Sequence, residues 1–264
     1  MKWVRLLPVV VLLGSCSANK PPLPKFAVSE APRPVPPVDA WTAKLRETDV
    51  VYFGLTKKSI ADSQPAWRIV ETLQGNGARV ALGWTDLAVT QQPLLDQWQR
   101  QEISGPELID QLGPPARRDW FQRALRPDLI QRALGSPPDL LRKIRAGEKL
   151  LAEERALLPN DYRAHPDDFD NFSDRVATSA RLRRYNMTHL YRAHLAAEQM
   201  AAENIVRFTR ESPEVKLLVF LPDDVMINPR EVADYVAQKT SARQMILDRS
   251  EKLPETRSQL LADL

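Results

Sequence analysis

Short, nearly continuous apolar runs alternate with helical patterns along most of this chain. The clearest run, at residues 215–221, is apolar at almost every position, as expected of a strand buried on both faces of a parallel sheet. Residues 49–54 and 79–84 read as two further strands, and a helical pattern at 63–75 joins them. Strand, helix and strand form the start of a βαβ unit, so the pattern predicts an α/β protein.

Helical spacing of apolar residues dominates the middle of the chain and predicts a helical insertion in the sheet. The expected helices of this region lie at 91–101, 105–112, 117–125, 139–147 and 148–158. A short third strand is expected within 129–138, although Gln131 and Arg132 weaken that prediction.

The longest helical pattern, at 181–210, carries one apolar stripe that includes His194, and a strand follows it. Residues 160–174 are polar and predict a surface excursion, and the last 20 or so residues predict a loosely packed tail. The expected fold class is therefore α/β, with a mostly parallel central sheet flanked by helices, a helical insertion and a single domain.

The N-terminus has the pattern of a targeting segment. Lys2 and Arg5 precede an apolar run at 6–13, which is too short to span a bilayer as a helix. The run leads to Cys16, the only cysteine of the chain, in a setting that resembles a bacterial lipobox. We therefore expect a lipoprotein signal peptide at 1–15 and a lipidated Cys16, and the alternative is an ordinary secretory signal with a chance cysteine. Serine at 17 favours the outer membrane of a Gram-negative bacterium, by resemblance to enterobacterial lipoproteins.

Residues 16–40 are rich in proline and predict a lipid-anchored tether in front of a folded domain at 41–264. A proline-rich ligand for another protein is the alternative function of this segment. The formal net charge is +3, and removal of Lys2 and Arg5 with the signal peptide lowers it to +1 (3 − 2 = 1). No block of Lys and Arg with interleaved aromatic residues is present in the sequence, which argues against nucleic-acid binding.

Sites of open α/β sheets usually form beyond the carboxyl ends of the strands. This rule directs attention to the residues that follow the three clearest apolar runs. The candidate site residues at these strand ends are Leu55, Lys57, Trp84, Asp86, Asp223 and Asp224.

The order of these patterns resembles the ChaN-like domain of haem-binding uptake lipoproteins, within the wider Tiki and erythromycin-esterase-like group, over roughly residues 45–240. Four stretches carry the resemblance. They are 49–54, then 80–83 with 91–104, then 138–144 with 153–159, and finally 200–205 before the strand at 215–221. The resemblance implies an α/β fold, haem binding and a role in iron uptake.

The chain departs from the family at the positions that carry polar chemistry. The family typically has Gly-Glu-x-His after the first strand, where this chain has Gly54-Leu55-Thr56-Lys57. A glutamate typically follows the second strand, where Trp84 and Thr85 stand here. A glycine-rich turn with a histidine typically follows the last strand, where Asp223 and Asp224 stand here. We therefore expect no metal site and no catalytic residues, and interpret the chain as a pseudoenzyme.

Haem binding, as implied by the resemblance, requires an axial ligand such as Tyr or His beside an apolar face. The candidate ligands are Tyr162, His165, Tyr185, His189 and Tyr191. For each, the alternative is an ordinary polar aromatic residue at the surface or at the edge of the core. His194 falls on the apolar stripe and is interpreted as a satisfied core histidine.

Three functions follow from these observations. The first is a membrane-anchored lipoprotein that binds haem in iron uptake and is catalytically inactive. The second is a degenerate scaffold that displays an interaction surface to a periplasmic or surface protein and has no ligand. The third is an esterase-like enzyme, which the missing Glu and His residues disfavour.

Overall fold

The structure is a computed structural model, and it describes residues 38–55, 64–113, 119–159, 168–177, 182, 184–222 and 228–247. The N-terminal segment with Cys16 therefore lies outside the described residues. The described residues all belong to one compact unit, Val35–Leu264.

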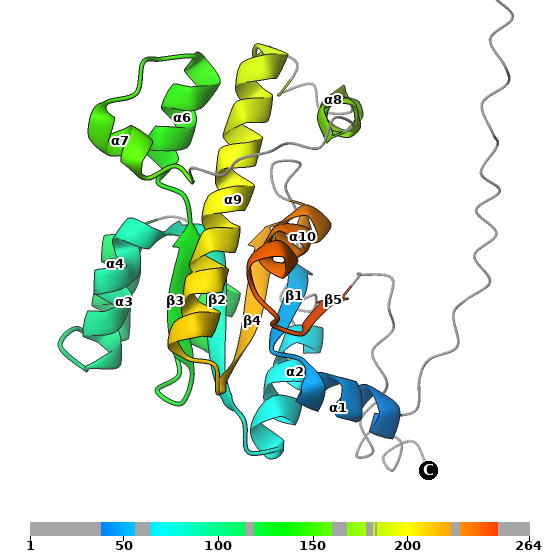
Figure 1. The fold of residues 1–264 in the computed structure, drawn as a ribbon. Coiled ribbons are helices and arrows are strands. Elements are labelled where there is room, and N and C mark those ends of the chain that lie inside the picture. Colours follow the sequence, from blue (N-terminus) through cyan, green and yellow to red (C-terminus); the bar gives the residue numbers. More distant parts are fainter. Residues whose placement is uncertain are drawn as a thin grey trace, which may run out of the picture. The chain divides into compact units, whose positions relative to one another are not determined.

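A five-stranded sheet with the order β3-β2-β4-β1-β5 forms the centre of this unit (Figure 1). Every pair of neighbouring strands is parallel. The strands are β1 (Val50–Leu55), β2 (Arg79–Ala88), β3 (Ile130–Gly135), β4 (Val215–Pro222) and β5 (Gln244–Leu247). The predicted α/β class with a parallel sheet is thus confirmed.

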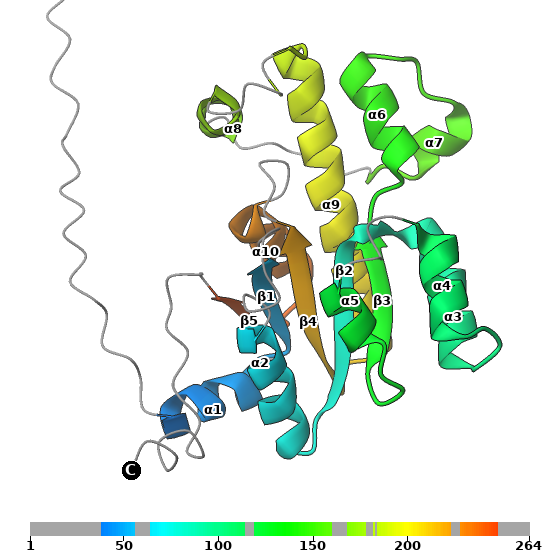
Figure 2. The ribbon, with the colours of Figure 1, turned by 180° about the vertical axis from the view of Figure 1, so that it is seen from behind.

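Alternation along each strand divides the core into two layers, because successive side chains point to opposite faces. Val51 and Phe53 of β1 belong to one apolar cluster, whereas Val50 and Tyr52 belong to the other. Helices α9 and α10 cover one face (Figure 1), and α2 and α5 lie over the other (Figure 2).

Ten α-helices occur in the described part of the chain, and most agree with the apolar patterns. Their bounds are α1 (Val38–Glu47), α2 (Gln64–Gly75), α3 (Gln92–Gln99), α4 (Gly105–Leu112), α5 (Asp119–Ala124), α6 (Pro138–Ala146), α7 (Ala152–Ala156), α8 (Asp168–Ala177), α9 (Met187–Glu211) and α10 (Pro229–Lys239). A 3₁₀ turn, η2 (Val89–Gln91), joins β2 to α3. No helix in the described ranges combines the length and the hydropathy that a membrane span requires.

The weak third strand is confirmed as β3, and the side chain of Gln131 explains why a polar residue fits there. This side chain is fully buried. Its Oε1 accepts a hydrogen bond from Trp84 Nε1 at 2.8 Å, and its Nε2 donates to the carbonyl of Ala124 at 2.8 Å. Gln131 is therefore a buried polar residue whose donor and acceptor are both used.

Three local predictions were wrong. The strand predicted at 79–84 continues to Ala88, and the polar residue Asp86 occupies a half-buried position within it. The polar stretch 160–174 contains the start of α8, whose Phe172 and Val176 are buried. The expected C-terminal tail begins later than predicted, because Gln244–Leu247 form β5, which pairs in parallel with β1; residues 248–264 lie outside the described residues. Each of these elements is too short or too polar to show a clear period in the sequence.

Gly135 lies where β3 meets an irregularity in β2, between Trp84 and Ala88. A Cβ atom at residue 135 would lie 2.8 Å from the carbonyl oxygen of Leu87, and closer still to that of Thr85. Both neighbours are backbone atoms of a paired strand, so neither can move without disturbing the sheet.

We expect Gly135→Ala to lower the free energy of unfolding by about 3 kcal/mol, because the new methyl group overlaps the backbone of β2. Gly75→Ala is the matched control, since no atom lies within 4 Å of a Cβ built there. It should leave stability unchanged or raise it by up to ~1 kcal/mol. Urea denaturation measures both, and equal midpoints for the two variants would contradict this account.

Candidate functional site

The residues predicted at the strand ends do not form a described cluster. Trp84 is fully buried inside β2, and its ring contacts Phe220 and Phe121 at centroid distances of 4.5 and 5.0 Å. It is a core residue rather than part of a site, because β2 runs on beyond it. Asp86 is half-buried in the same strand. Leu55 ends β1, but its side chain lies outside the described part, as do Lys57, Asp223 and Asp224.

The described haem-ligand candidates lie at the start of α9. Tyr191 is buried, with its ring 5.1 Å from that of Phe169 and 5.4 Å from that of Phe172. Tyr185 and His189 are half-buried. Tyr162 and His165 lie outside the described residues.

His189 packs on the last turn of α6. A Cβ atom at Gly147 would overlap the His189 ring, and Gly147 also has a φ of 71°, in the left-handed region that favours glycine. The ring of His189 is thus held against the backbone of α6, which is the ordinary position of a packing residue.

A polar cluster inside the helical layer joins α8, α9 and α10. His194 is fully buried, as expected from its place on the apolar stripe. Its Nε2 lies 3.0 Å from Glu231 Oε2 and 3.3 Å from Glu198 Oε2. Arg175 also approaches this nitrogen, with its Nη2 at 3.3 Å. We call these four residues the His194 cluster.

Asn228 fixes the outer oxygen of each carboxylate in the His194 cluster. Its backbone N–H donates to Glu198 Oε1 at 2.6 Å, and its side-chain Nδ2 donates to Glu231 Oε1 at 2.8 Å. Arg175 Nη1 is also 3.0 Å from Glu231 Oε1. Each carboxylate therefore has its Oε1 held by donors and its Oε2 directed towards His194.

The pKa values of the two carboxyl groups are shifted in opposite directions. Burial raises the pKa of Glu198 well above its usual range, and the neighbouring Glu231 raises it further. Burial also opposes the ionisation of Glu231, but hydrogen bonds with His194, Glu198 and Asn228 outweigh it and lower the pKa of that carboxyl group. The pair therefore favours one proton, held on Glu198.

Chain connectivity places the His194 cluster on the carboxyl-end side of the sheet. Asn228 caps α10, the helix that follows β4 in the chain. The N-terminal half of α9 and α8 stand above the carboxyl ends of the strands (Figure 1). Sequence reasoning expected the site near this edge but missed these residues. The only available signal was the spacing of His194 and Glu198, which places both on one side of a helix.

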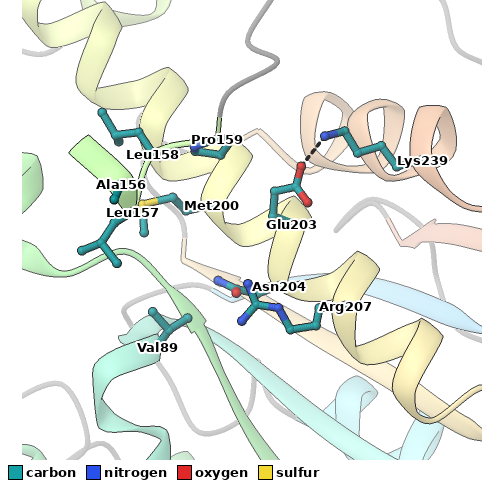
Figure 3. Close-up of a pocket in the computed structure, with 10 residues that line it drawn as sticks. All are labelled: Val89, Ala156, Leu157, Leu158, Pro159, Met200, Glu203, Asn204, Arg207 and Lys239. Carbon is teal, nitrogen blue, oxygen red and sulfur yellow. Dashed lines mark hydrogen bonds and ion pairs between the residues drawn. The ribbon is translucent and has the colours of Figure 1, made fainter. Parts of the chain in front are cut away.

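A cavity of about 450 Å³ lies along a different side of α9 (Figure 3). Its residues come from η2, α9, α10 and the end of α7. They are Val89, Ala156, Leu157, Leu158, Pro159, Met200, Glu203, Asn204, Arg207 and Lys239. The apolar residues gather towards α7, whereas the Glu203–Lys239 ion pair lies at the other end (Figure 3). Tyr185, His189 and Tyr191 do not line this cavity.

A family model described as haem-binding uptake, Tiki superfamily, ChaN matches residues 41–221. This chain belongs to the ChaN family. The match covers more than half of the chain and agrees with the resemblance stated from the sequence. It includes His194 and Glu198 but ends before Glu231, so the second acidic member of the His194 cluster lies beyond the matched segment.

A solved structure of a ChaN protein has the same fold. It is described as "Cofacial heme binding to ChaN of Campylobacter jejuni" and is 14% identical to this chain, with a TM-score of 0.57. The likeness covers 80% of this chain and 88% of that chain. No curated protein sequence matches this chain.

Asn228→Ala tests whether Asn228 holds the His194 cluster together. The change removes the cap of α10 and the donor to Glu231, so it should lower the free energy of unfolding by about 2–3 kcal/mol. Asn186→Ala is the control, because Asn186 caps α9 by accepting a hydrogen bond from the backbone of His189. That change should cost only about 1 kcal/mol. Equal losses in urea denaturation would mean that Asn228 acts as a helix cap alone.

Proposed function

We propose that this chain binds haem and that the cavity beside α9 holds it. The observation that carries this proposal is the division of the cavity into an apolar end and a charged end. A porphyrin is a flat apolar ring with carboxylates along one edge, and it needs both kinds of surface. A volume of about 450 Å³ also lies in the range of roughly 300–1,000 Å³ that is usual for small-molecule sites. Membership of the haem-binding uptake family supports the same function.

The apolar end offers Leu157, Leu158 and Met200 to the ring. Leu157 is 45% exposed, so its side chain is accessible to a ligand at the apolar end of the cavity. At the charged end, Arg207 is exposed and available for a carboxylate, whereas Lys239 is already paired with Glu203. Arginine suits this role because its guanidinium can make two parallel hydrogen bonds to one carboxylate.

Haem iron accepts His, Tyr, Met or Cys as an axial ligand. The thioether of Met200 is the described ligand of this kind in the cavity. Tyr162 and His165, which follow Pro159 of the cavity wall in the sequence, are the ligands to be tested beside it.

A haemin titration of the purified full chain, followed through its Soret band, tests the proposal. Leu157→Gln should weaken binding by roughly five-fold, because a polar group replaces apolar contact area. Leu151→Gln is the matched control, since Leu151 is 55% exposed at the other end of α7 and does not line the cavity. Arg207→Glu should weaken binding by roughly three- to ten-fold. Arg192→Glu, on an exposed position of α9 outside the cavity, should not.

Met200→Leu, Tyr162→Phe and His165→Gln then identify the axial ligand by the loss of its spectral signature. A saturable Soret change that is insensitive to Leu157→Gln and Arg207→Glu would mean that haem binds at another surface. Tyr185 and His189 would then be the next candidate ligands. A flat response to haemin would favour the alternative function. The exposed side chains of Leu151 and Leu157 would then be contacts for a protein partner rather than for haem.

We further propose that the chain acts as a binding protein and not as an enzyme. The support is the sequence at the strand ends, where Leu55, Trp84 and Asp223 stand in place of the Glu and His residues typical of the family. Trp84 is moreover buried in the core, where it cannot reach a substrate.

We propose that the domain is held at the outer membrane by a lipid on Cys16. The support is the short apolar run and the position of the only cysteine. Cys16→Ser should release the protein into the soluble periplasmic fraction or leave it uncleaved in the inner membrane. Membrane fractionation with intact-mass analysis separates these outcomes. A cleaved Cys16→Ser protein that stays in the outer membrane would refute the lipid anchor.

A further inference from the structure

We propose that the His194 cluster is a site for one divalent transition-metal ion, with His194 Nε2, Glu198 Oε2 and Glu231 Oε2 as ligands. These three atoms all lie within 4.8 Å of one another. The proposal does not depend on haem binding. The cluster and the cavity use different sides of α9, because a helix turns by about 100° per residue.

The spacing of the ligand atoms is close to that around a small cation. Zinc binds nitrogen and oxygen ligands at about 2.0–2.2 Å, so neighbouring ligand atoms of a tetrahedral site stand roughly 3.3–3.5 Å apart. His194 Nε2 is 3.3 Å from Glu198 Oε2, which lies in this range. It is 3.0 Å from Glu231 Oε2, a hydrogen-bonding distance, so the Glu231 carboxylate must move back slightly to admit the ion. One imidazole and two carboxylates form a donor set that suits zinc and other first-row transition metals better than magnesium.

The outer contacts of the ligands also have the arrangement of a metal site. Metal-binding carboxylates are usually held by hydrogen bonds from a second layer of groups. Asn228 holds the Oε1 atom of both Glu198 and Glu231, which leaves both Oε2 atoms directed to a common point. The face of the His194 ring is packed on Phe172 at 4.5 Å, so the ring orientation is fixed as well.

His194 Nε2 lies among two carboxylate oxygens and the Nη2 of Arg175, a donor. A metal ion would replace the protons shared within this cluster and accept lone pairs from all three ligands. Arg175 then acts as the competitor of the metal ion for Glu231.

The test uses the purified full chain with Cys16→Ser, which removes its only thiol as a zinc ligand. After chelator treatment and dialysis, Zn²⁺ is titrated by calorimetry, and Co²⁺ is titrated as a spectroscopic probe. We expect one Zn²⁺ per chain and an absorption band of nitrogen- and oxygen-bound Co²⁺ that Zn²⁺ abolishes. In this background, Glu231→Gln should weaken Zn²⁺ binding by about 10- to 100-fold. Glu203→Gln is the matched control, because Glu203 is a half-buried glutamate of α9 that pairs with Lys239 instead.

Arg175→Gln gives a result that a purely structural cluster would not. Loss of the competing cation should tighten Zn²⁺ binding by roughly three-fold or more. Circular dichroism verifies that each variant is folded. The proposal is overturned if Zn²⁺ does not bind at one per chain, or if folded Glu231→Gln binds as tightly as Glu203→Gln. It is also overturned if folded Arg175→Gln binds no more tightly than its parent.

Discussion

Burial of β4 on all sides is the constraint on which this structure depends. β4 pairs with β2 on one side and with β1 on the other, and a helical layer covers each face. Leu217, Leu218, Val219 and Phe220 alternate between the two apolar clusters, so both faces must be apolar at once. The same requirement places Trp84 in the core, since β2 pairs with β4 from Arg79 to Trp84.

The second constraint is the burial of α9 among its neighbouring helices. This helix of 25 residues packs against α6, α8 and α10, and most of its residues from Leu190 to Phe208 are buried. A histidine and a glutamate on its buried side must be compensated within the protein, because a buried charge without partners is very costly. Arg175, Asn228 and Glu231 supply that compensation from two other helices. Among the described residues, the buried ionisable pair His194 and Glu198 therefore lies between helices rather than at the strand ends.

Two sides of α9 thus carry different chemistry. One side presents Met200 and Arg207 to a cavity with an apolar end and a charged end, a surface suited to an amphipathic ligand. The other side presents His194 and Glu198 to a small polar site that is closed to large molecules. The family match extends across the residues of α9 and ends with β4, before α10 contributes Glu231.

The sequence by itself determined the strands and helices whose burial is periodic, such as the apolar run of β4 and the stripe of α9. It also identified the family, because the order of strands and helices along the chain can be recognised from the sequence patterns. It did not determine β5, the continuation of β2 or α8, because a few residues carry too little period to outweigh their polar neighbours. Glu198 lies one turn after His194 on α9, so the sequence alone places these two side by side. The other two partners were decided by the tertiary structure, because Arg175 lies on α8 and Glu231 on α10. Only the packing of these helices on α9 brings both side chains within hydrogen-bonding distance of the same nitrogen.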